Sequence, residues 1–507
     1  MIALCIDAGT SLVKCVAFDE DGRQVAVAAR QTEVTHPVPG ANEQDMDGVW
    51  AATCAVVREV AAGLGDRVGA LALTAQGDGC WLVDDDGRPT GPAVLWNDAR
   101  ATPVVDAWDA AGLVEEAFRR SGSVANAGVP HAILAFLREH EPARVERAAT
   151  VLTCGGWLFA QLTGERVVDV SEASNPWMRA DDPATSGRDY GADVLALHDL
   201  EWIAPLLPEL VDGERRVAPL GAGAAEALGL PKGLDVVLAP YDIVATAIGV
   251  GATSPDVACS ILGTTLCTQV MTPSPDLTGV PSGMTLRTGI PGRDLRSFGT
   301  LAGTEVIDWA VDLLGLREPA ELSELAAAAQ GGRDATPVLL PYLSPAGERA
   351  PIRDPAASGA LLGLRLGQGR EELARAIFDG LALVVRDCLE AADVTPHELR
   401  VCGGGSASDL WCSLIADVCA IPVVRTTDAQ CGAKGAQVAA RVALGRAPDA
   451  DTAAAELVHV GTRFEPDGAR HEAAQAGYER FVALRESARE GQWPRLHPAS
   501  APTAPAA

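Results

Sequence analysis

A short polar turn near the N-terminus has the residue types of a phosphate-binding loop. The segment Asp7-Ala8-Gly9-Thr10-Ser11 separates two apolar runs that alternate like β-strands. Gly9 lets backbone amides approach phosphate oxygens, the hydroxyls of Thr10 and Ser11 can donate to them, and Asp7 can hold Mg²⁺ through water. Lys14, at the start of the next strand, can neutralise charge. The same residues also suit an ordinary hairpin turn, so the motif alone leaves both interpretations open.

A similar turn recurs in the second half of the chain. Gly263-Thr264-Thr265 lies between the apolar runs VACSIL and LCTQVM, so DAGTSLVKCVAF and LGTTLCTQV have the form of a diverged internal repeat. Amides and hydroxyls of this turn could clasp the β- and γ-phosphates of a nucleotide from the side opposite to the first turn. A polar hairpin is the alternative. The repeat predicts two related domains that face one another.

A third glycine-rich segment, Gly403-Gly404-Gly405-Ser406, lies between a predicted strand and a predicted helix. Its glycines let the backbone pass close to a flat ligand such as adenine, with the helix N-terminus near ribose or phosphate. A dinucleotide fingerprint would need a further glycine at position 408, which is Ser408. The segment therefore favours a nucleotide site over that of a dehydrogenase.

A carboxylate at a strand-to-helix junction could act as a general base. Asp242 ends the segment Ala239-Pro240-Tyr241-Asp242, which follows the apolar run LDVVL and precedes a helix. An alcohol hydroxyl is a poor nucleophile, and a carboxylate within hydrogen-bond reach can accept its proton during phosphoryl transfer. Aspartate is also a favoured helix N-cap. The residues alone do not choose between the two roles.

The elements around these motifs predict an α/β protein of two domains. Strands are expected over the first 35 residues and in VGALALTAQ, and helices over 49–65 and most of 103–162. A chain of 507 residues exceeds what one hydrophobic core usually organises. The expected division is a first domain over 1–248, a second, nucleotide-binding domain over 249–485, and a disordered Pro- and Ala-rich tail over 486–507.

Composition excludes several classes of partner. A net charge of −28 disfavours a nucleic acid, because binding its phosphate backbone needs clustered Lys and Arg. No apolar run approaches the length of about 20 residues that spans a bilayer, and the N-terminus has no signal-peptide pattern. A soluble, cytoplasmic protein is expected. The 12 cysteines form no Cys-x-x-Cys pair and are interpreted as buried thiols rather than metal ligands.

Longer motifs resemble the FGGY family of carbohydrate kinases over about residues 1–485. Gly359–Leu364, seven further residues and then Glu372–Asp379 reproduce the family's second signature position by position. The segments PYLSPAGERAPIRDPAASG, CGGGSASDLWCSLIADVCAIPV and LTGERVVDVSEAS are similar to family segments as well. The resemblance implies two actin-like (ribonuclease H-like) domains around a central cleft, and an ATP-dependent kinase acting on a small polyol or ketose.

The resemblance also implies roles for individual residues. Asp242 becomes the general base, and Asp7 the residue that binds Mg²⁺. The substrate site comprises Gln76, Asp78, Trp96, Asp98 and Arg100 together with Asp242. The ATP site comprises Gly9, Thr10, Ser11, Lys14, Gly263, Thr264, Thr265, Gly303, Gly403, Gly404, Gly405 and Ser406. Polyhydroxylated ligands need carboxylate acceptors, Arg and Gln donors and an aromatic face, all of which this set offers. A solvated loop with a structural Trp is the alternative for the residues around Trp96.

The chain departs from the family at two places. His131 stands where many members have Lys, and Gly77-Asp78 stands where glycerol kinases have Arg-Glu and xylulokinases have Met-His. The Gln-Gly-Asp-Gly stretch resembles what is expected of erythritol- or L-xylulose-type kinases, with xylulokinase or glycerol kinase activity as the alternative. A non-catalytic actin-fold sensor or filament subunit is disfavoured, because it has no use for Asp242 and a polar sugar loop. The oligomeric state stays open, a homodimer being one option.

Overall fold

The computed structural model describes residues 2–173, 190–329 and 337–496. Contacts divide the chain into two compact units that do not follow a single linear boundary. The first unit contains the chain up to residue 254 and, in addition, residues 271–296 and 430–459. The second contains 255–270, 297–429 and the chain from 460 onward. The division expected at residue 248 did not include the two later segments in the first unit.

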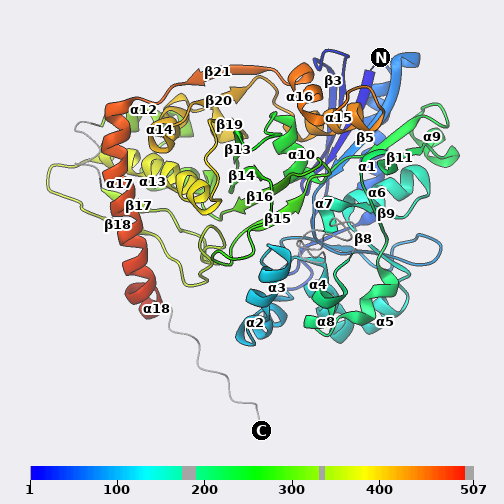
Figure 1. The fold of residues 1–507 in the computed structure, drawn as a ribbon, viewed down its shortest axis with the longest axis horizontal. Helices are drawn as coiled ribbons and strands as arrows, with labels where there is room; N and C mark the ends of the chain where they lie inside the picture. Colours follow the sequence, from blue (N-terminus) through cyan, green and yellow to red (C-terminus); the bar gives the residue numbers. More distant parts are fainter. Residues whose placement is uncertain (1, 174–189, 330–336, 497–507) are drawn as a thin grey trace, which may run out of the picture. The chain divides into compact units, whose positions relative to one another are not determined.

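A six-stranded sheet organises the first unit (Figure 1), in the order β11-β12-β5-β1-β2-β3. Its strands are β1 (Ile2–Ala8), β2 (Leu12–Phe18), β3 (Gln24–Gln31), β5 (Val68–Ala75), β11 (Val217–Pro219) and β12 (Asp235–Leu238). The neighbours β1, β2 and β3 pair antiparallel, as the apolar alternation of the first 35 residues predicted. The pairs β1–β5 and β5–β12 are parallel, so three strands end at one edge of the sheet.

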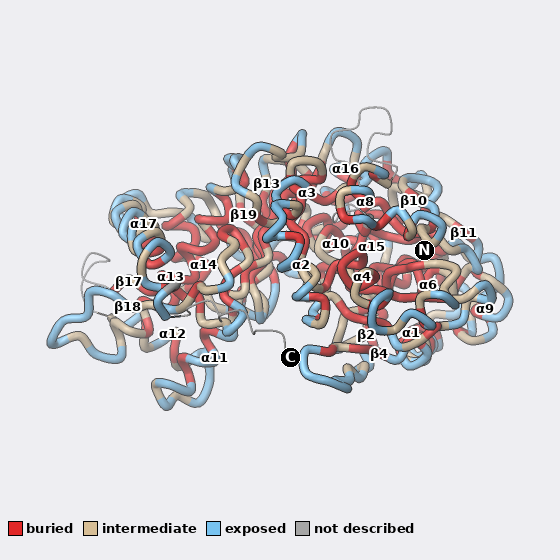
Figure 2. The backbone as a smooth tube through the Cα atoms, turned by 90° about the horizontal axis from the view of Figure 1, so that it is seen from below, coloured by how far each residue is buried: buried red, intermediate tan, exposed pale blue. Residues whose placement is uncertain are grey.

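Helices from distant parts of the sequence cover this sheet. They are α1 (Met46–Ala61), α6 (Cys154–Thr163), α9 (Ala222–Leu228), α10 (Asp242–Gly249), α15 (Cys431–Ala443) and α16 (Ala450–Leu457). In Figure 1, α15 lies beside the N-terminal strands, and its residues 431–440 are buried, as the red tube in Figure 2 indicates. A Cβ atom on Gly435 would lie 1.7 Å from the carbonyl oxygen of Ala245. Glycine therefore lets α15 cross α10 at close range.

A mostly helical part completes the first unit. It contains α2 (Thr102–Ala110), α3 (Leu113–Ser121), α4 (Pro130–His140), α5 (Pro142–Glu146), α7 (Val170–Ala173) and α8 (Ala192–Leu197). The short strands are β4 (Glu43–Gln44), β6 (Trp81–Val83), β7 (Ala93–Val94), β8 (Thr150–Leu152), β9 (Val167–Asp169) and β10 (Glu209–Val211). The helices expected between residues 103 and 162 are confirmed. His131 packs inside this part, stacked on Trp108 with ring centroids 5.3 Å apart.

A seven-stranded sheet repeats the topology of the first sheet. Its order is β15-β16-β14-β13-β19-β20-β21, with β13 and β14 antiparallel and β13, β19 and β20 parallel. The strands are β13 (Val257–Leu262), β14 (Leu266–Thr272), β15 (Met284–Arg287), β16 (Asp294–Gly299), β19 (Glu398–Cys402), β20 (Val423–Thr426) and β21 (Val460–Phe464). Thus β13, β14, β19 and β20 repeat the pairing of β1, β2, β5 and β12. The repeat inferred from the two Gly-Thr turns is present in the topology.

Four long helices surround this second sheet, and their buried faces form one apolar cluster with its strands. They are α11 (Thr304–Leu313), α13 (Arg370–Ala391), α14 (Asp409–Cys419) and α17 (Gly468–Ser487). The shorter α12 (Pro319–Ala327) and the hairpin of β17 (Val338–Leu340) and β18 (Ala360–Leu362) complete the unit. Within the described parts of the chain, no helix has the length and apolar character needed to cross a membrane.

The chain stays helical beyond residue 485, so the tail expected over 486–507 was placed too early. The helix α17 runs to Ser487, a π-helical segment follows over Ala488–Gln492, and α18 covers Trp493–Leu496. Trp493 is 1% exposed, and its indole N–H donates to the carbonyl oxygen of Ser358 over 2.9 Å. A buried aromatic anchor therefore outweighs the polar, Pro-containing composition. Residues 497–507 lie outside the described part of the chain.

Candidate active site

The parallel strands of the first sheet bring the predicted catalytic residues to one edge. Asp7 lies at the end of β1, level with Thr74 of β5, and Asp78 and Asp242 follow β5 and β12. The carboxyl ends of adjacent parallel strands meet at the same edge of a sheet. The charges of Asp7 and Asp78 both raise the pKa of Asp242, so the three carboxylates lie within electrostatic range of one another.

Asp242 has the environment of a general base. Burial, followed by the negative charges of Asp7 and Asp78, raises the pKa of its carboxyl to about 7, although a hydrogen bond from the backbone N–H of Ile243 opposes this. The N-cap of α10 is Tyr241, and Asp242 is the first helical residue, so the alternative N-cap role does not fall on Asp242. A carboxylate whose pKa lies near neutrality can accept a proton at neutral pH and release it afterwards.

Three hydrogen bonds fix the backbone that leads to Asp242. Ala239 N–H donates to Leu73 O over 2.8 Å, and the hydroxyl of Thr74 donates to Pro240 O over 2.7 Å. On the other side, the backbone N–H of Tyr241 donates to Ser171 Oγ over 3.1 Å. Asp242 therefore follows a segment that is held from β5 and from α7.

A buried charge pair supports the Ser171 contact. Ser171 Oγ donates to Asp169 Oδ1 over 2.5 Å, and the other oxygen of Asp169 forms an ion pair with Arg216. Asp169 is 1% exposed, so its charge depends on these partners. Because the Ser171 hydroxyl donates to Asp169, its oxygen is oriented to accept from Tyr241.

Asp7 pairs with Lys14 across the first hairpin, with Nζ 3.7 Å from Oδ2. Burial raises the pKa of Asp7, and Lys14 opposes that shift. A Cβ atom on Gly432, in the first turn of α15, would lie 3.2 Å from the same carboxylate. Asp7 thus lies between β2 and the N-terminus of α15, which is more than 400 residues further along the chain.

The carboxylates fit the way in which kinases hold magnesium. Mg²⁺ usually takes one or two carboxylates, waters and the phosphates of its nucleotide, and not a cage built only of protein groups. Among the described residues no cluster of three or more His, Cys, Asp or Glu could enclose a metal ion. Asp7 and Asp242 offer oxygen ligands of the right kind without forming such a cage. The donor set is therefore compatible with a magnesium–nucleotide complex.

The hydroxyl of Thr10 is used within the protein. It donates to Gln76 Oε1 over 2.7 Å and accepts from the indole N–H of Trp96 over 2.9 Å. Gln76 in turn donates to Gln44 Oε1 over 2.8 Å, and Gln44 donates back to the carbonyl oxygen of Thr10 over 2.5 Å. Gln76 is 3% exposed. The structure thus brings Thr10, Gln76 and Trp96 together, with Gln76 engaged by protein groups.

Asp98 and Arg100 form a buried ion pair. The guanidinium donates to both carboxylate oxygens of Asp98, from Nε to Oδ1 and Oδ2 over 3.1 and 3.0 Å and from Nη2 to Oδ2 over 2.8 Å. It also donates to Glu43 Oε1 over 2.7 Å. Asp98 accepts a further bond from the backbone N–H of Asn42 and is 2% exposed. Both residues of the predicted sugar loop therefore brace the segment around residue 43.

Asp78 is the partly exposed carboxylate at the end of β5, and its backbone is in the left-handed region with φ 54°. Both neighbours are packed against other chain segments. A Cβ atom on Gly79 would lie 2.7 Å from Val94 O, and one on Gly77 would lie 2.2 Å from Cδ2 of Tyr241. Within residues 77–79, only Asp78 carries a side chain.

The nucleotide motifs of the second unit form tight turns. Gly303 precedes α11 and lies so close to the 263–265 turn that a Cβ would be 2.2 Å from Thr264 O. Thr264 is exposed, as a phosphate-binding turn requires. Farther on, Gly403 has φ 85° and packs against Leu262, and a Cβ on Gly405 would meet the ring of Trp411. These glycines are needed by the fold, whereas Gly404 faces open space.

Two buried groups complete the description of the first unit. Glu172 accepts from Thr153 Oγ1 over 2.9 Å. Burial and the charges of Asp78 and Asp242 raise its pKa well above the usual range, despite the Thr153 bond. No chemical role for Glu172 was predicted, although it lies in the segment LTGERVVDVSEAS that resembles a family loop. His131 is a buried core residue, and its burial lowers its pKa well below the usual value.

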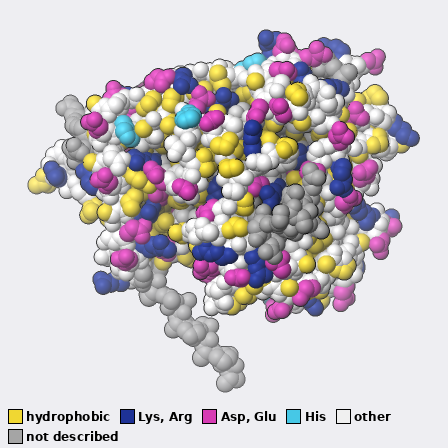
Figure 3. All heavy atoms as spheres, viewed as in Figure 1, with side chains coloured by type: hydrophobic (Ala, Val, Ile, Leu, Met, Phe, Trp, Pro, Cys, Tyr) yellow, Lys and Arg dark blue, Asp and Glu magenta, His cyan; other side chains and the backbone are white. Residues whose placement is uncertain are grey.

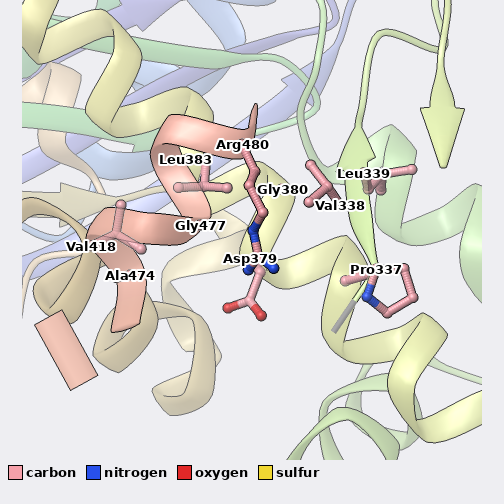
Figure 4. A pocket seen from close by; sticks show the side chains of 11 residues that line it. Pro337, Val338, Leu339, Asp379, Gly380, Leu383, Val418, Ala474, Gly477 and Arg480 are labelled. Carbon is pink, nitrogen blue, oxygen red and sulfur yellow. The ribbon is translucent and has the colours of Figure 1, made fainter. Parts of the chain in front are cut away.

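The cavity next to α13 is too small for a nucleotide. A cavity of about 30 Å³ lies between α13, α17 and β17, with Asp379 and Arg480 among its mostly apolar lining residues (Figure 4). This volume suits about one water molecule, far less than a ligand pocket. On the face shown in Figure 3, acidic and basic side chains are interspersed.

Two family models match the chain along most of its length. The N-terminal domain of the FGGY family of carbohydrate kinases matches residues 2–249, and the C-terminal domain matches 258–444. The chain belongs to the FGGY family of carbohydrate kinases. It is therefore a phosphotransferase with an alcohol group as acceptor, and the family implies ATP as the phosphoryl donor.

Individual relatives agree with this assignment. An erythritol kinase from Brucella abortus is 35% identical over 505 residues, covering 96% of this chain and 95% of the relative. A xylulose kinase from Escherichia coli is 31% identical over 427 residues, covering 82% and 84%. The crystal structure of a xylulose kinase from Rhodospirillum rubrum has a TM-score of 0.87 at 28% identity, covering 97% and 99%. The actin-like fold class predicted from the sequence is confirmed.

Proposed function

We propose that this chain is an ATP- and Mg²⁺-dependent kinase of a small neutral polyol or ketose with four or five carbons, preferring an erythritol- or L-xylulose-type substrate. The observation that carries the proposal is Asp242, a carboxylate with its pKa raised to about 7 and its backbone held by Thr74 and Ser171. The similarity to an erythritol kinase supports the choice of substrate class. The similarity to a xylulose kinase supports the ketose as the alternative.

Asp242 accepts the proton of the substrate hydroxyl while the γ-phosphoryl group is transferred. Asp7 would hold the magnesium ion, which when bound neutralises phosphate charge. Lys14 lies beside Asp7. The turn 9–11 and the turn 263–265, with Gly303, bind the phosphates through backbone amides. The 403–406 segment binds the adenosine part. Because the Thr10 hydroxyl is engaged by Gln76 and Trp96, the contribution of Thr10 to phosphate binding comes from its backbone N–H.

Asp78 is the substrate acceptor in this proposal. It is partly exposed and close enough to raise the pKa of Asp242, whereas Asp98 is only 2% exposed. A carboxylate accepts hydrogen bonds from neutral hydroxyls and repels an anionic substrate. Neutral sugars should therefore be preferred over aldonates and sugar phosphates.

An ADP-release screen tests the proposal. Purified protein with Mg·ATP is given tetritols, pentitols, ketopentoses and glycerol, together with gluconate and a sugar phosphate. We expect the highest kcat/KM for a neutral substrate of four or five carbons. If gluconate or a sugar phosphate is turned over fastest, this interpretation of the pocket is wrong. If folded protein releases no ADP with any member of the panel, the proposed substrate class is wrong.

A further inference from the structure

Gly77 and Tyr241 meet where residues 77–79 touch the segment that leads to Asp242. A Cβ atom on Gly77 would lie 2.2, 2.5 and 2.8 Å from Cδ2, Cε2 and Cγ of Tyr241. These distances are far shorter than any van der Waals contact between carbon atoms. The backbone of Gly77 is not in the left-handed region, since its φ is outside the positive range in which Gly79 lies. Position 77 therefore excludes a side chain because of the Tyr241 ring and not because of its own backbone conformation.

Tyr241 has little freedom to move away. It is 3% exposed, its backbone N–H is bonded to Ser171, and the preceding carbonyl of Pro240 is bonded to Thr74. The atoms that a Cβ would meet include Cγ and Cδ2, which are close to the tyrosine backbone and cannot swing aside as the tip of a flexible side chain could. A side chain at position 77 would therefore displace the Tyr241 backbone. Asp242 follows directly.

We propose that Tyr241 is a positioning residue. Its ring fills the space that a side chain at position 77 would need, and so fixes the position of Asp242. It also leaves Asp78 as the one residue of 77–79 whose side chain can contact the polyol. The inference rests on the proposed function, since Asp242 is taken as its base. With the ring in place, position 77 cannot accept the Arg side chain expected there in glycerol kinases or the Met side chain expected there in xylulokinases. Asp78 alone faces the substrate from residues 77–79.

Two variants and their combination test this inference. Gly77→Ala should lower kcat for the best polyol by about 10²-fold, because a displacement near 1 Å at a reacting group can cost that much. The KM for ATP should change little. Tyr241→Ala removes the ring. In the Tyr241→Ala background, Gly77→Ala should therefore lower kcat by less than about a tenth of the fold decrease that it causes in the wild type. Gly223→Ala is the matched control, because a Cβ there has no neighbour within 4 Å and the residue lies far along the chain in α9.

Thermal unfolding of the wild type, the two single variants and the double variant separates rescue from general destabilisation. Two unrelated lesions would add in Tm, whereas a steric pair should give a double variant at least as stable as Gly77→Ala. If Gly77→Ala does not fold, a soluble and active double variant still supports the pair, and an equally insoluble one overturns it. If the wild-type enzyme is active and Gly77→Ala lowers kcat by the same factor in both backgrounds, this inference is overturned while the proposed function stands. Wild-type protein inactive on the whole panel contradicts the proposed function, and this inference falls with it.

Discussion

Thr10 Oγ1 donates a hydrogen bond to Gln76 Oε1 over 2.7 Å, and so joins the turn expected to bind phosphate to the strand end expected to bind polyol. The indole N–H of Trp96 donates to the same hydroxyl over 2.9 Å. A residue predicted for one ligand is therefore bonded to two residues predicted for the other. Its side chain is bonded to residues predicted to bind polyol, and its backbone lies in the turn predicted to bind phosphate.

Thr10→Val should weaken polyol binding more than ATP binding. The substitution keeps the shape but leaves Gln76 Oε1 and Trp96 Nε1 without this partner, at a cost of about 1–3 kcal/mol. We expect the KM for polyol to rise about tenfold or more, which corresponds to about 1.4 kcal/mol. Thr10→Ser keeps the hydroxyl and is the control. Steady-state KM values decide, and a rise confined to ATP would show that the hydroxyl serves the nucleotide.

Asp242→Asn should lower kcat by about 10²–10⁴-fold, the usual contribution of a general base, with the KM for polyol within a few fold. In the wild type, kcat/KM should rise with pH and level off above about pH 7, because the base works in its ionised form and its pKa is raised to about 7. Asp78→Asn removes one of the charges that raise this pKa, so its acid limb should move to lower pH. More than half of wild-type kcat in Asp242→Asn would remove Asp242 from the mechanism.

Asp78→Asn and Asp78→Ala should differ in stability but not in polyol binding. Either change removes a charged acceptor, which costs about 1.5–3 kcal/mol in binding. Asp78 has φ 54°, a conformation that Asn tolerates and that costs other residues about 1–2 kcal/mol. Urea unfolding should therefore show an extra loss for Asp78→Ala alone. Equal unfolding midpoints for the two variants would show that the loop conformation is not strained.

Arg100→Met should destabilise the fold instead of acting on substrate binding alone. It leaves Asp98, which is 2% exposed, without its guanidinium, and breaking a buried pair costs about 3–5 kcal/mol. Arg88→Met, which removes an exposed pair with Asp86, is the control and should cost less than about 1 kcal/mol. Urea unfolding of both variants measures the difference. A higher polyol KM at unchanged stability would instead make Arg100 a substrate ligand.

Local patterns were enough to predict the first hairpin and the repeat of topology, because alternation and a Gly-Thr turn are written in consecutive residues. The role of Asp242 came from the family resemblance, since a junction aspartate alone also suits a cap. The engagement of Gln76 by Gln44 could not be predicted, because residues 32 positions apart share no local pattern. The same holds for Gly77, whose reason is a tyrosine ring contributed from beyond residue 240.

The place of α15 in the first unit has a consequence for synthesis of the chain. When residue 254 has left the ribosome, every strand of the first sheet exists, but the helix that covers one face does not. Cys5, Val16, Ala72 and Val237 pack in one cluster with Ala433 and Ala436 of α15. A fragment of residues 1–254 should therefore bind a hydrophobic dye and be cleaved rapidly by protease, unlike the full chain. The unit that begins first is completed late, and its uncovered apolar sheet face is open to aggregation during translation.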